Sequence, residues 1–199
     1  MVLASHVIFT AYGFWLPNDP RGSWSKFVAS WELFRFGPAT KIETRQSVAH
    51  SPHDRERRHV AKEAMKFPAV SFSGLQARAV ARGFAECICR GGLQVLACAI
   101  LPEHVHMVIA RHSCRVEQIV GLLKGEATRR LASENLHPFM GRMAGQNIPT
   151  CWARRCWKVF LDSVEDIDRA IRYVEENPIK EGKPRQRWWF VTPWKHTLV

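Results

Sequence analysis

Two histidines separated by one valine, His104 and His106, stand at the start of an apolar segment that ends at Ala110. Side chains alternate between the two faces of an extended strand, so we expect both imidazoles to point the same way. Two imidazoles on one face can bind the same metal ion. The alternative is that each is an ordinary buried histidine bonded to the backbone, which is the commoner case for an isolated pair.

Tyr173 and Asn177 form the second group of residues suited to chemistry. They lie in a segment whose apolar residues repeat at helical spacing, namely Val164, Ile167, Ile171 and Val174. At about 100° per residue, Tyr173 lies roughly 140° from the centre of that stripe, and Asn177 follows one turn later. Both side chains are therefore expected off the packed face. The alternative is a surface tyrosine and an asparagine that ends the helix before Pro178.

The rest of the chain predicts the elements that position these residues. The expected strands are rich in apolar and β-branched residues and span residues 5–11, 93–101, 104–110 and 155–161. The expected helices carry apolar residues every three or four positions and span residues 55–67, 73–91, 115–133 and 163–177. Ser73 with Gln76 and Ser163 with Asp166 are capping boxes that mark two helix starts.

This order of elements predicts an α+β fold, a mostly antiparallel sheet with helices packed against it. Pro102 and Glu103 join two of the strands and favour a hairpin. Residues 25–60 have little periodicity, and we interpret them as a basic, irregular insertion. We expect one domain over residues 1–182, followed by a basic, aromatic tail over residues 183–199.

Composition points to a polyanionic partner. The chain of 199 residues is 46% hydrophobic, which is enough for one core, and 29 Lys and Arg against 18 Asp and Glu give a formal net charge of +11. Such a basic chain favours nucleic acid, and its eight Trp and eleven Phe offer surfaces on which unpaired bases can stack. The alternative is a basic surface that only keeps the protein in solution.

Cysteine spacing and hydropathy predict a cytoplasmic protein with no membrane partner, and the expected nucleic-acid partner makes it nucleoid-associated. The six cysteines include no Cys-x-x-Cys pair and lack the spacing of a zinc module or a secreted disulfide framework. The sequence starts without a positively charged, apolar leader, and no apolar run approaches the length of a membrane span.

Three ordered motifs resemble a known family. They are the Pro-Glu-His-Val-His-Met-Val-Ile segment 102–109, the Ala-Ile-Arg-Tyr-Val-Glu-Glu-Asn-Pro-Ile-Lys-Glu-Gly segment 170–182, and the Trp-Leu-Pro and Asp-Pro-Arg-Gly pieces of segment 9–22. Together the motifs resemble the HUH single-tyrosine transposases of bacterial insertion sequences, most closely their REP-associated tyrosine transposase branch. Glu103 departs from the Asn or Asp that often precedes the histidine pair, and residues 25–60 have no counterpart in the family.

The resemblance implies a ferredoxin-like sheet with a C-terminal catalytic helix, the HUH endonuclease fold. It also implies that His104, His106 and Asn177 bind a divalent metal ion, Mg²⁺ or Mn²⁺, and that Tyr173 is the nucleophile. The implied activity is a single-stranded DNA endonuclease and strand transferase that forms a 5′-phosphotyrosine intermediate on hairpin-forming palindromic DNA. The assembly could be a monomer or a homodimer.

Eight cations are candidate DNA contacts: Lys124, Arg129, Arg130, Arg154, Arg155, Lys158, Arg185 and Arg187. The alternative for each is a solvated basic surface, and the tail's tryptophans could instead fix the tail to the domain. Two other functions would fit the same motifs. One is a hairpin-binding protein that has lost cleavage, and the other is a nickase of the replication-initiator type.

Overall fold

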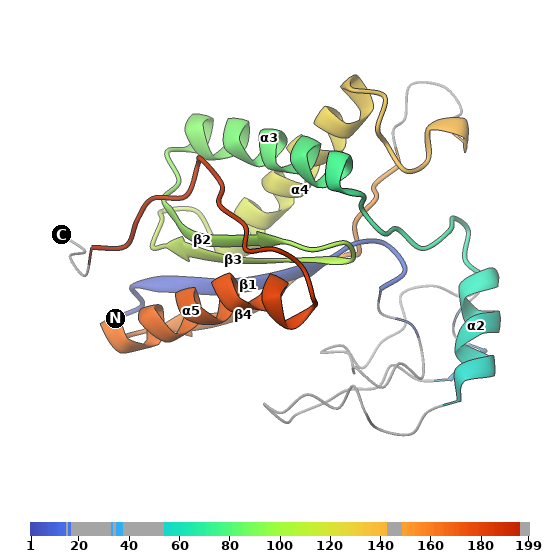
Figure 1. Cartoon of the computed structure of the whole chain (residues 1–199), viewed down its shortest axis with the longest axis horizontal. Helices are drawn as coiled ribbons and strands as arrows, with labels where there is room; N and C mark the ends of the chain where they lie inside the picture. Colours follow the sequence, from blue (N-terminus) through green and yellow to red (C-terminus); the bar gives the residue numbers. More distant parts are fainter. Residues whose placement is uncertain (15, 17–32, 34, 38–53, 143–148, 196–199) are drawn as a thin grey trace.

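The computed structural model describes residues 1–14, 16, 33, 35–37, 54–142 and 149–195. Its centre is one antiparallel sheet of four strands, in the order β2-β3-β1-β4 (Figure 1). The strands are β1 (Ala4–Thr10), β2 (Val95–Ile100), β3 (His104–Ala110) and β4 (Trp157–Leu161). This is the ferredoxin-like order, so the predicted α+β fold is confirmed. Most of the predicted insertion at 25–60 lies outside the described residues.

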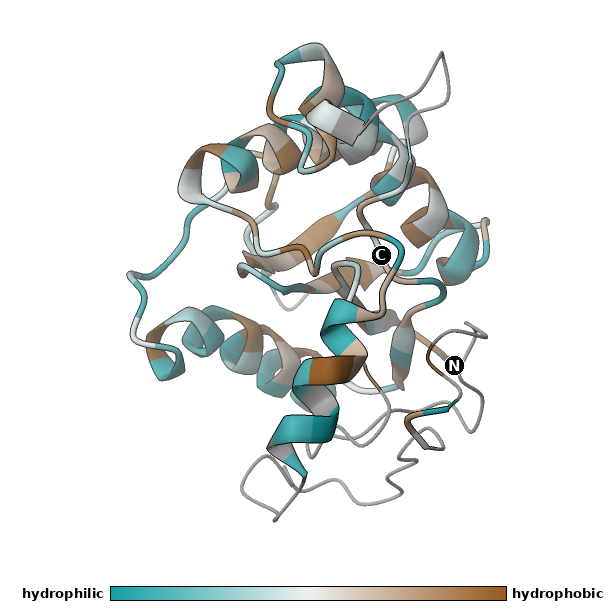
Figure 2. Ribbon diagram, turned by 90° about the vertical axis from the view of Figure 1, so that its right-hand side faces the viewer, coloured by the Kyte–Doolittle hydropathy of each residue, from teal (hydrophilic) through white to brown (hydrophobic). Residues whose placement is uncertain are grey.

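Helices cover both faces of the sheet. They are α2 (Arg55–Glu63), α3 (Gly74–Gly91), α4 (Val116–Ser133) and α5 (Val164–Lys180), with a short 3-10 turn η1 (Met140–Arg142). The pair α3 and α4 lies on one face and α5 on the other (Figure 1). Helix α2 stands apart from the sheet (Figure 1) and is mostly hydrophilic (Figure 2). Every predicted strand and helix is therefore present, and the main differences are at their ends.

Local sequence signals set the starts of the two helices that matter most. The Ser73 hydroxyl accepts a hydrogen bond from the backbone of Gln76, whose side chain accepts one from the Ser73 backbone, which confirms that capping box. The Ser163 hydroxyl accepts a bond from the Asp166 backbone and starts α5. Each cap satisfies backbone N–H groups that have no partner within the helix.

The predicted end of α5 before Pro178 is wrong, because the helix continues to Lys180. Pro178 has no N–H to donate to Val174, but that is a single lost bond in the last turns of the helix. The Pro178 ring is buried, and its carbonyl accepts a hydrogen bond from the Lys183 backbone at 2.8 Å. The Glu181 N–H also bonds to the Asn177 carbonyl at 3.2 Å. The extra turn brings Glu181 to the sheet.

The register of the strands divides the core between the two faces. Val7 and Phe9 of β1 and Met107 of β3 belong to the larger cluster, which α3 and α4 cover. Residues of the opposite parity, such as Ala4 and Val108, pack against α5. Because β1 and β3 pair directly, with Ile8 opposite His106, the even-numbered side chains of both strands share the α5 face.

Gly83 allows α3 and α4 to approach closely. A Cβ at this position would lie 2.8 Å from backbone atoms of Ala127, so Gly83→Ala forces the helices apart. We expect a loss of about 1–3 kcal/mol in the free energy of unfolding, measured by urea titration. As the matched control, Gly121→Ala adds a Cβ that meets nothing within 4 Å and is expected to gain up to about 1 kcal/mol. Equal effects of the two variants would contradict this packing.

The structure also shows the state of the cysteines and whether a helix could span a membrane. All six cysteines fall in the described part of the chain and are free thiols. Within the described ranges, no helix combines the length and apolar character needed to cross a membrane.

Candidate active site

His104 and His106 lie side by side at the start of β3, on the face that α5 covers. Their ring centroids are 5.0 Å apart, and His106 is buried while His104 is partly buried. The prediction that both rings share one face is therefore confirmed. They are polar exceptions on this face, whose neighbouring positions Ala99, Val108 and Ala110 are apolar.

Helix α5 brings Tyr173 and Asn177 to these histidines. Its buried residues Ile167, Ala170 and Val174 hold it against the sheet. The Asn177 side-chain nitrogen lies 3.0 Å from Nε2 of His106, and the Tyr173 ring centroid lies 5.5 Å from that of His106. Tyr173 keeps 44% of its surface exposed, so a large substrate can reach it. The tyrosine, the asparagine and the histidine pair therefore meet at one place.

Asn177 is buried, contrary to the prediction that it lies off the packed face. The face of the sheet opposite Asn177 presents His106. An amide can be buried against an imidazole because the two side chains form a hydrogen bond with each other. The packed side of the helix is thus rotated from the predicted stripe toward Asn177, and Val164 and Ile171 are only partly buried. Tyr173 is off the packed side, as predicted.

His6 of β1 is a third imidazole in this cluster, and the sequence analysis missed it. Its Nε2 lies 3.3 Å from Nδ1 of His106, and its ring centroid is 5.6 Å from that of Tyr173. The signal was present in the sequence, because His6 alternates with Val7 and Phe9, which have the parity of a core face. Placing His6 beside His106, however, requires the knowledge that β1 pairs with β3.

Burial keeps the inner imidazoles neutral. It lowers the pKa of His6 from 6.5 to about 4. Burial also holds the pKa of His106 well below its usual value, and the charges of His104 and His6 act in the same direction. A neutral imidazole has a free lone pair for a metal ion or a hydrogen bond.

The shifted pKa of His6 predicts a pH-dependent stability in the metal-free protein. Between pH 6.5 and about 4, the unfolded chain binds a proton at His6 that the folded protein does not, so stability falls as the pH falls. At about 1.4 kcal/mol per pKa unit the loss is about 3 kcal/mol, measurable by urea unfolding in EDTA. His6→Gln should have a shallower dependence, whereas His59→Gln on α2 should match the wild type. Identical profiles for all three proteins would contradict the shift.

Two further charged groups border the site. Glu181 Oε1 lies 3.4 Å from Nε2 of His104, which the extra turn of α5 makes possible. Lys180 Nζ lies 5.3 Å from the centroid of the Tyr173 ring. A cavity of about 400 Å³ opens beside Glu181, which lines it together with residues that include Phe14, Glu103 and His104.

The donors present fit a divalent metal ion. Two imidazoles and an amide oxygen form a mixed nitrogen and oxygen set, and rotating the Asn177 amide by half a turn would direct its oxygen toward His106. Within the described residues, no group of three or more His, Cys, Asp or Glu side chains forms a metal site. The proposed set therefore combines the two imidazoles with the Asn177 amide oxygen.

The family model of IS200-like transposases matches residues 70–177, which is more than half of the chain. The chain belongs to the IS200-like transposase family. The match begins before α3 and ends at Asn177, so it includes the histidine pair and Tyr173. This membership confirms the recognition of a transposase from the ordered motifs.

Two solved structures resemble this transposase weakly. The first, a REP-associated tyrosine transposase bound to a REP hairpin, is 11% identical, with a TM-score of 0.47 over 90% of this chain and 68% of that one. The second, a candidate transposase from Deinococcus radiodurans R1, is 14% identical, with a TM-score of 0.41 over 88% and 91%. Neither similarity is strong enough to bear on the reaction. No curated protein matches the chain.

Most of the cations predicted to contact DNA have partners within the transposase itself. Lys124 donates to the carbonyls of Ala153 and Arg155, and burial lowers its pKa to about 8. The other paired cations are Arg129 with Glu126, Arg130 with Glu86 and Glu134, Lys158 with Glu117, and Arg185 with Glu175. Arg154, Arg155 and Arg187 are exposed. The first two line a groove of about 770 Å³ between α4 and residues 150–156.

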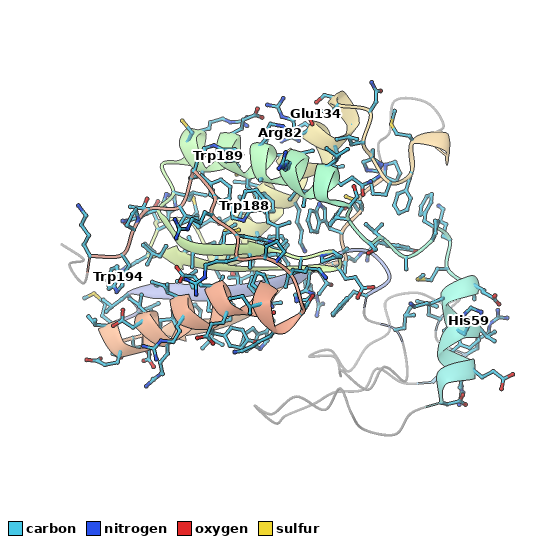
Figure 3. The ribbon with its side chains drawn as sticks, in the orientation of Figure 1. His59, Arg82, Glu134, Trp188, Trp189 and Trp194 are labelled. Carbon is cyan, nitrogen blue, oxygen red and sulfur yellow. The ribbon has the colours of Figure 1, made fainter. Side chains whose placement is uncertain are left out.

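Residues 186–192 of the tail lie along the outer edge of β2. Both ends of the Gln186 amide bond to the Ile100 backbone, at 2.8 and 2.7 Å, and Thr192 donates to the Val95 carbonyl. Trp188 packs against the core, while Trp189 keeps 65% of its surface exposed (Figure 3). The tail is thus fixed to the domain and also presents an exposed aromatic ring.

Proposed function

We propose that this transposase cuts and rejoins single-stranded DNA through a covalent bond between Tyr173 and a 5′-phosphate, beside a divalent metal ion. The meeting of Tyr173, His106 and Asn177 supports the proposal most directly, with 5.5 Å between the two ring centroids and 3.0 Å between the amide and His106. A histidine pair with no chemical role would not need an exposed phenol beside it.

The proposed reaction exchanges one phosphodiester for another. The Tyr173 oxygen forms a bond to phosphorus, the bond from phosphorus to the 3′ oxygen breaks, and the phenol proton ends on the released 3′-hydroxyl. The number of phosphoester bonds does not change, so the step is nearly isoenergetic and reversible. Rejoining therefore needs no nucleotide, which agrees with the lack of a Gly-x-x-x-x-Gly-Lys-Ser/Thr motif in the sequence.

The residues around Tyr173 have distinct roles in this proposal. His104, His106 and the Asn177 oxygen would hold Mg²⁺ or Mn²⁺, which when bound supplies positive charge to the phosphate oxygens. Asn177 sits one turn beyond Tyr173, so the same helix fixes the distance between the nucleophile and the metal ligands. Lys180, which lies near the Tyr173 ring and also pairs with Glu176 at 3.1 Å, would add positive charge where the phosphate arrives.

We propose that the substrate is a single strand that folds into a hairpin at an imperfect palindrome, as the motif resemblance implies. The exposed Arg154 and Arg155 would contact phosphates, and the tail's Arg187 and Trp189 would contact unpaired nucleotides. The direct test is incubation of labelled hairpin DNA with the protein and Mn²⁺, followed by denaturing electrophoresis. A covalent complex supports the proposal, whereas tight binding without cleavage under any divalent ion supports the DNA-binding alternative.

Phosphate contacts predict a strong dependence of DNA affinity on salt. With 6 to 10 contacts, affinity should fall by about 10³ to 10⁵ between 50 and 200 mM salt. Arg154→Ala should lower the slope of log affinity against log salt by about one, because one contact is lost. Lys62→Ala on α2, which stands apart from the sheet, should leave the slope unchanged. Fluorescence anisotropy measures the affinities, and a flat salt response would contradict a nucleic-acid partner.

A further inference from the structure

His6 occupies a position where packing alone favours an apolar residue. In the register of the sheet it lies between Val108 of β3 and Val159 of β4, on the face that α5 covers. Only 7% of its surface is exposed. A buried polar ring costs free energy unless it is hydrogen-bonded, and its Nε2 lies 3.3 Å from Nδ1 of His106.

The two nitrogens of His106 face different partners. Nε2 lies 3.0 Å from the Asn177 amide, on the side of the proposed metal ligands, while Nδ1 lies 3.3 Å from His6. A neutral imidazole carries one proton, so only one of its nitrogens offers a lone pair. His106 can use Nε2 as a ligand only if Nδ1 keeps the proton, and a buried N–H group of this kind needs a hydrogen-bond acceptor.

We propose that His6 is a positioning residue for the metal site, accepting a hydrogen bond from the Nδ1–H group of His106 and so fixing the tautomer and orientation of that ligand. This inference rests on the proposed function. Partners of this kind commonly hold metal-binding histidines, and they are usually carboxylates or carbonyls. Here a neutral imidazole from the neighbouring strand takes that place.

The three rings support one another. His6, His106 and Tyr173 form a triangle whose ring centroids are 5.5, 5.6 and 5.5 Å apart. The edge of Trp157 packs against His6 at 5.7 Å and holds it from the β4 side. Loss of the His6 ring would therefore release His106 and leave it free to turn or to change tautomer. A loose ligand binds metal more weakly.

The tautomer can be tested in the wild-type protein without any substitution. Long-range ¹H–¹⁵N correlation spectra of metal-free protein labelled at histidine report which ring nitrogen carries the proton. We expect His106 to carry it on Nδ1, with Nε2 unprotonated. A proton on Nε2 of His106 would overturn the inference, because Nδ1 would then have no N–H group to donate to His6.

Binding of Mn²⁺ alone tests whether loss of the His6 ring weakens the metal site. His6→Leu removes the acceptor and should weaken Mn²⁺ binding by about 10- to 100-fold. Electron paramagnetic resonance of the free ion measures this affinity. His6→Gln places an oxygen near the position of Nε2 and should recover most of the affinity. A purely structural role predicts no recovery with Gln. Unchanged affinity in His6→Leu, or equal loss in both variants, would overturn the inference.

His106→Ala separates this inference from the proposed function. If His106→Ala abolishes Mn²⁺ binding while His6→Leu does not affect it, the positioning role of His6 is wrong and the metal site stands. If His106→Ala leaves Mn²⁺ binding intact, the metal site itself is wrong. A graded loss of Mn²⁺ affinity supports both the metal site and the positioning role of His6. In that case His106→Ala binds Mn²⁺ more weakly than His6→Leu, and His6→Leu binds it more weakly than His6→Gln.

Discussion

Tyr173→Phe abolishes the covalent protein–DNA complex and lowers cleavage of single-stranded hairpin DNA by a factor on the order of 10³ or more, as loss of a nucleophile does in other enzymes. The phenylalanine ring keeps the contacts with His6 and His106 and removes only the attacking oxygen. The variant should therefore fold like the wild type, and its affinities for Mn²⁺ and for DNA should stay within a few fold of the wild-type values. Denaturing electrophoresis of labelled DNA measures the complex.

Tyr12 provides the matched control, because it is the other tyrosine of the sequence. Its ring packs against Phe67 and Phe139, on the side of the sheet away from α5. Tyr12→Phe is expected to form the covalent complex at the wild-type rate. A complex that persists in Tyr173→Phe, or that disappears in Tyr12→Phe, would contradict the role of Tyr173.

His106→Ala has the second largest expected effect. A metal ion that stabilises charge on phosphate contributes several kcal/mol, so its loss should slow cleavage by about 10² to 10³-fold. The variant should also lose the stimulation by Mn²⁺ that is expected of the wild type. Adding EDTA to the wild type should lower its rate to a similar level, because both changes remove the same ion.

His59→Ala controls for the loss of a histidine elsewhere. His59 lies exposed on α2, where it pairs with Glu63 at 3.3 Å, and its loss should leave both the rate and the Mn²⁺ response unchanged. Thermal unfolding should be recorded in parallel, since His106 is buried. If the His106→Ala protein is folded and still cleaves DNA in a Mn²⁺-dependent manner, the assigned metal site is incorrect.

Local patterns in the sequence predicted much of this fold. The alternation of β3 places His104 and His106 on one face, and the spacing of four residues brings Tyr173 and Asn177 close together on α5. The capping residues Ser73 and Ser163 mark their helices correctly. These features depend on neighbours within a few residues, which is why a single sequence can reveal them.

The features that the sequence did not reveal depend on tertiary contacts. Burial of the Pro178 ring, together with bonds to later backbone groups, carries α5 two residues beyond the proline, to Lys180, so Glu181 reaches His104. His6 joins the cluster only because β1 pairs with β3 in one register. The carbonyls of Ala153 and Arg155 that bind Lys124, and the Glu86 carboxylate that pairs with Arg130, come from distant segments, so the availability of these two cations to DNA could not be judged from sequence.

Peptide mapping of the covalent complex tests the central claim most directly. The wild-type protein is incubated with Mn²⁺ and single-stranded oligonucleotides that carry a hairpin beside a randomised segment, then digested with nuclease and trypsin. We predict a nucleotide phosphate attached to Tyr173 in the tryptic peptide 173–180. Cleaved DNA with the adduct on another residue, or with no adduct, would contradict the claim that Tyr173 is the nucleophile.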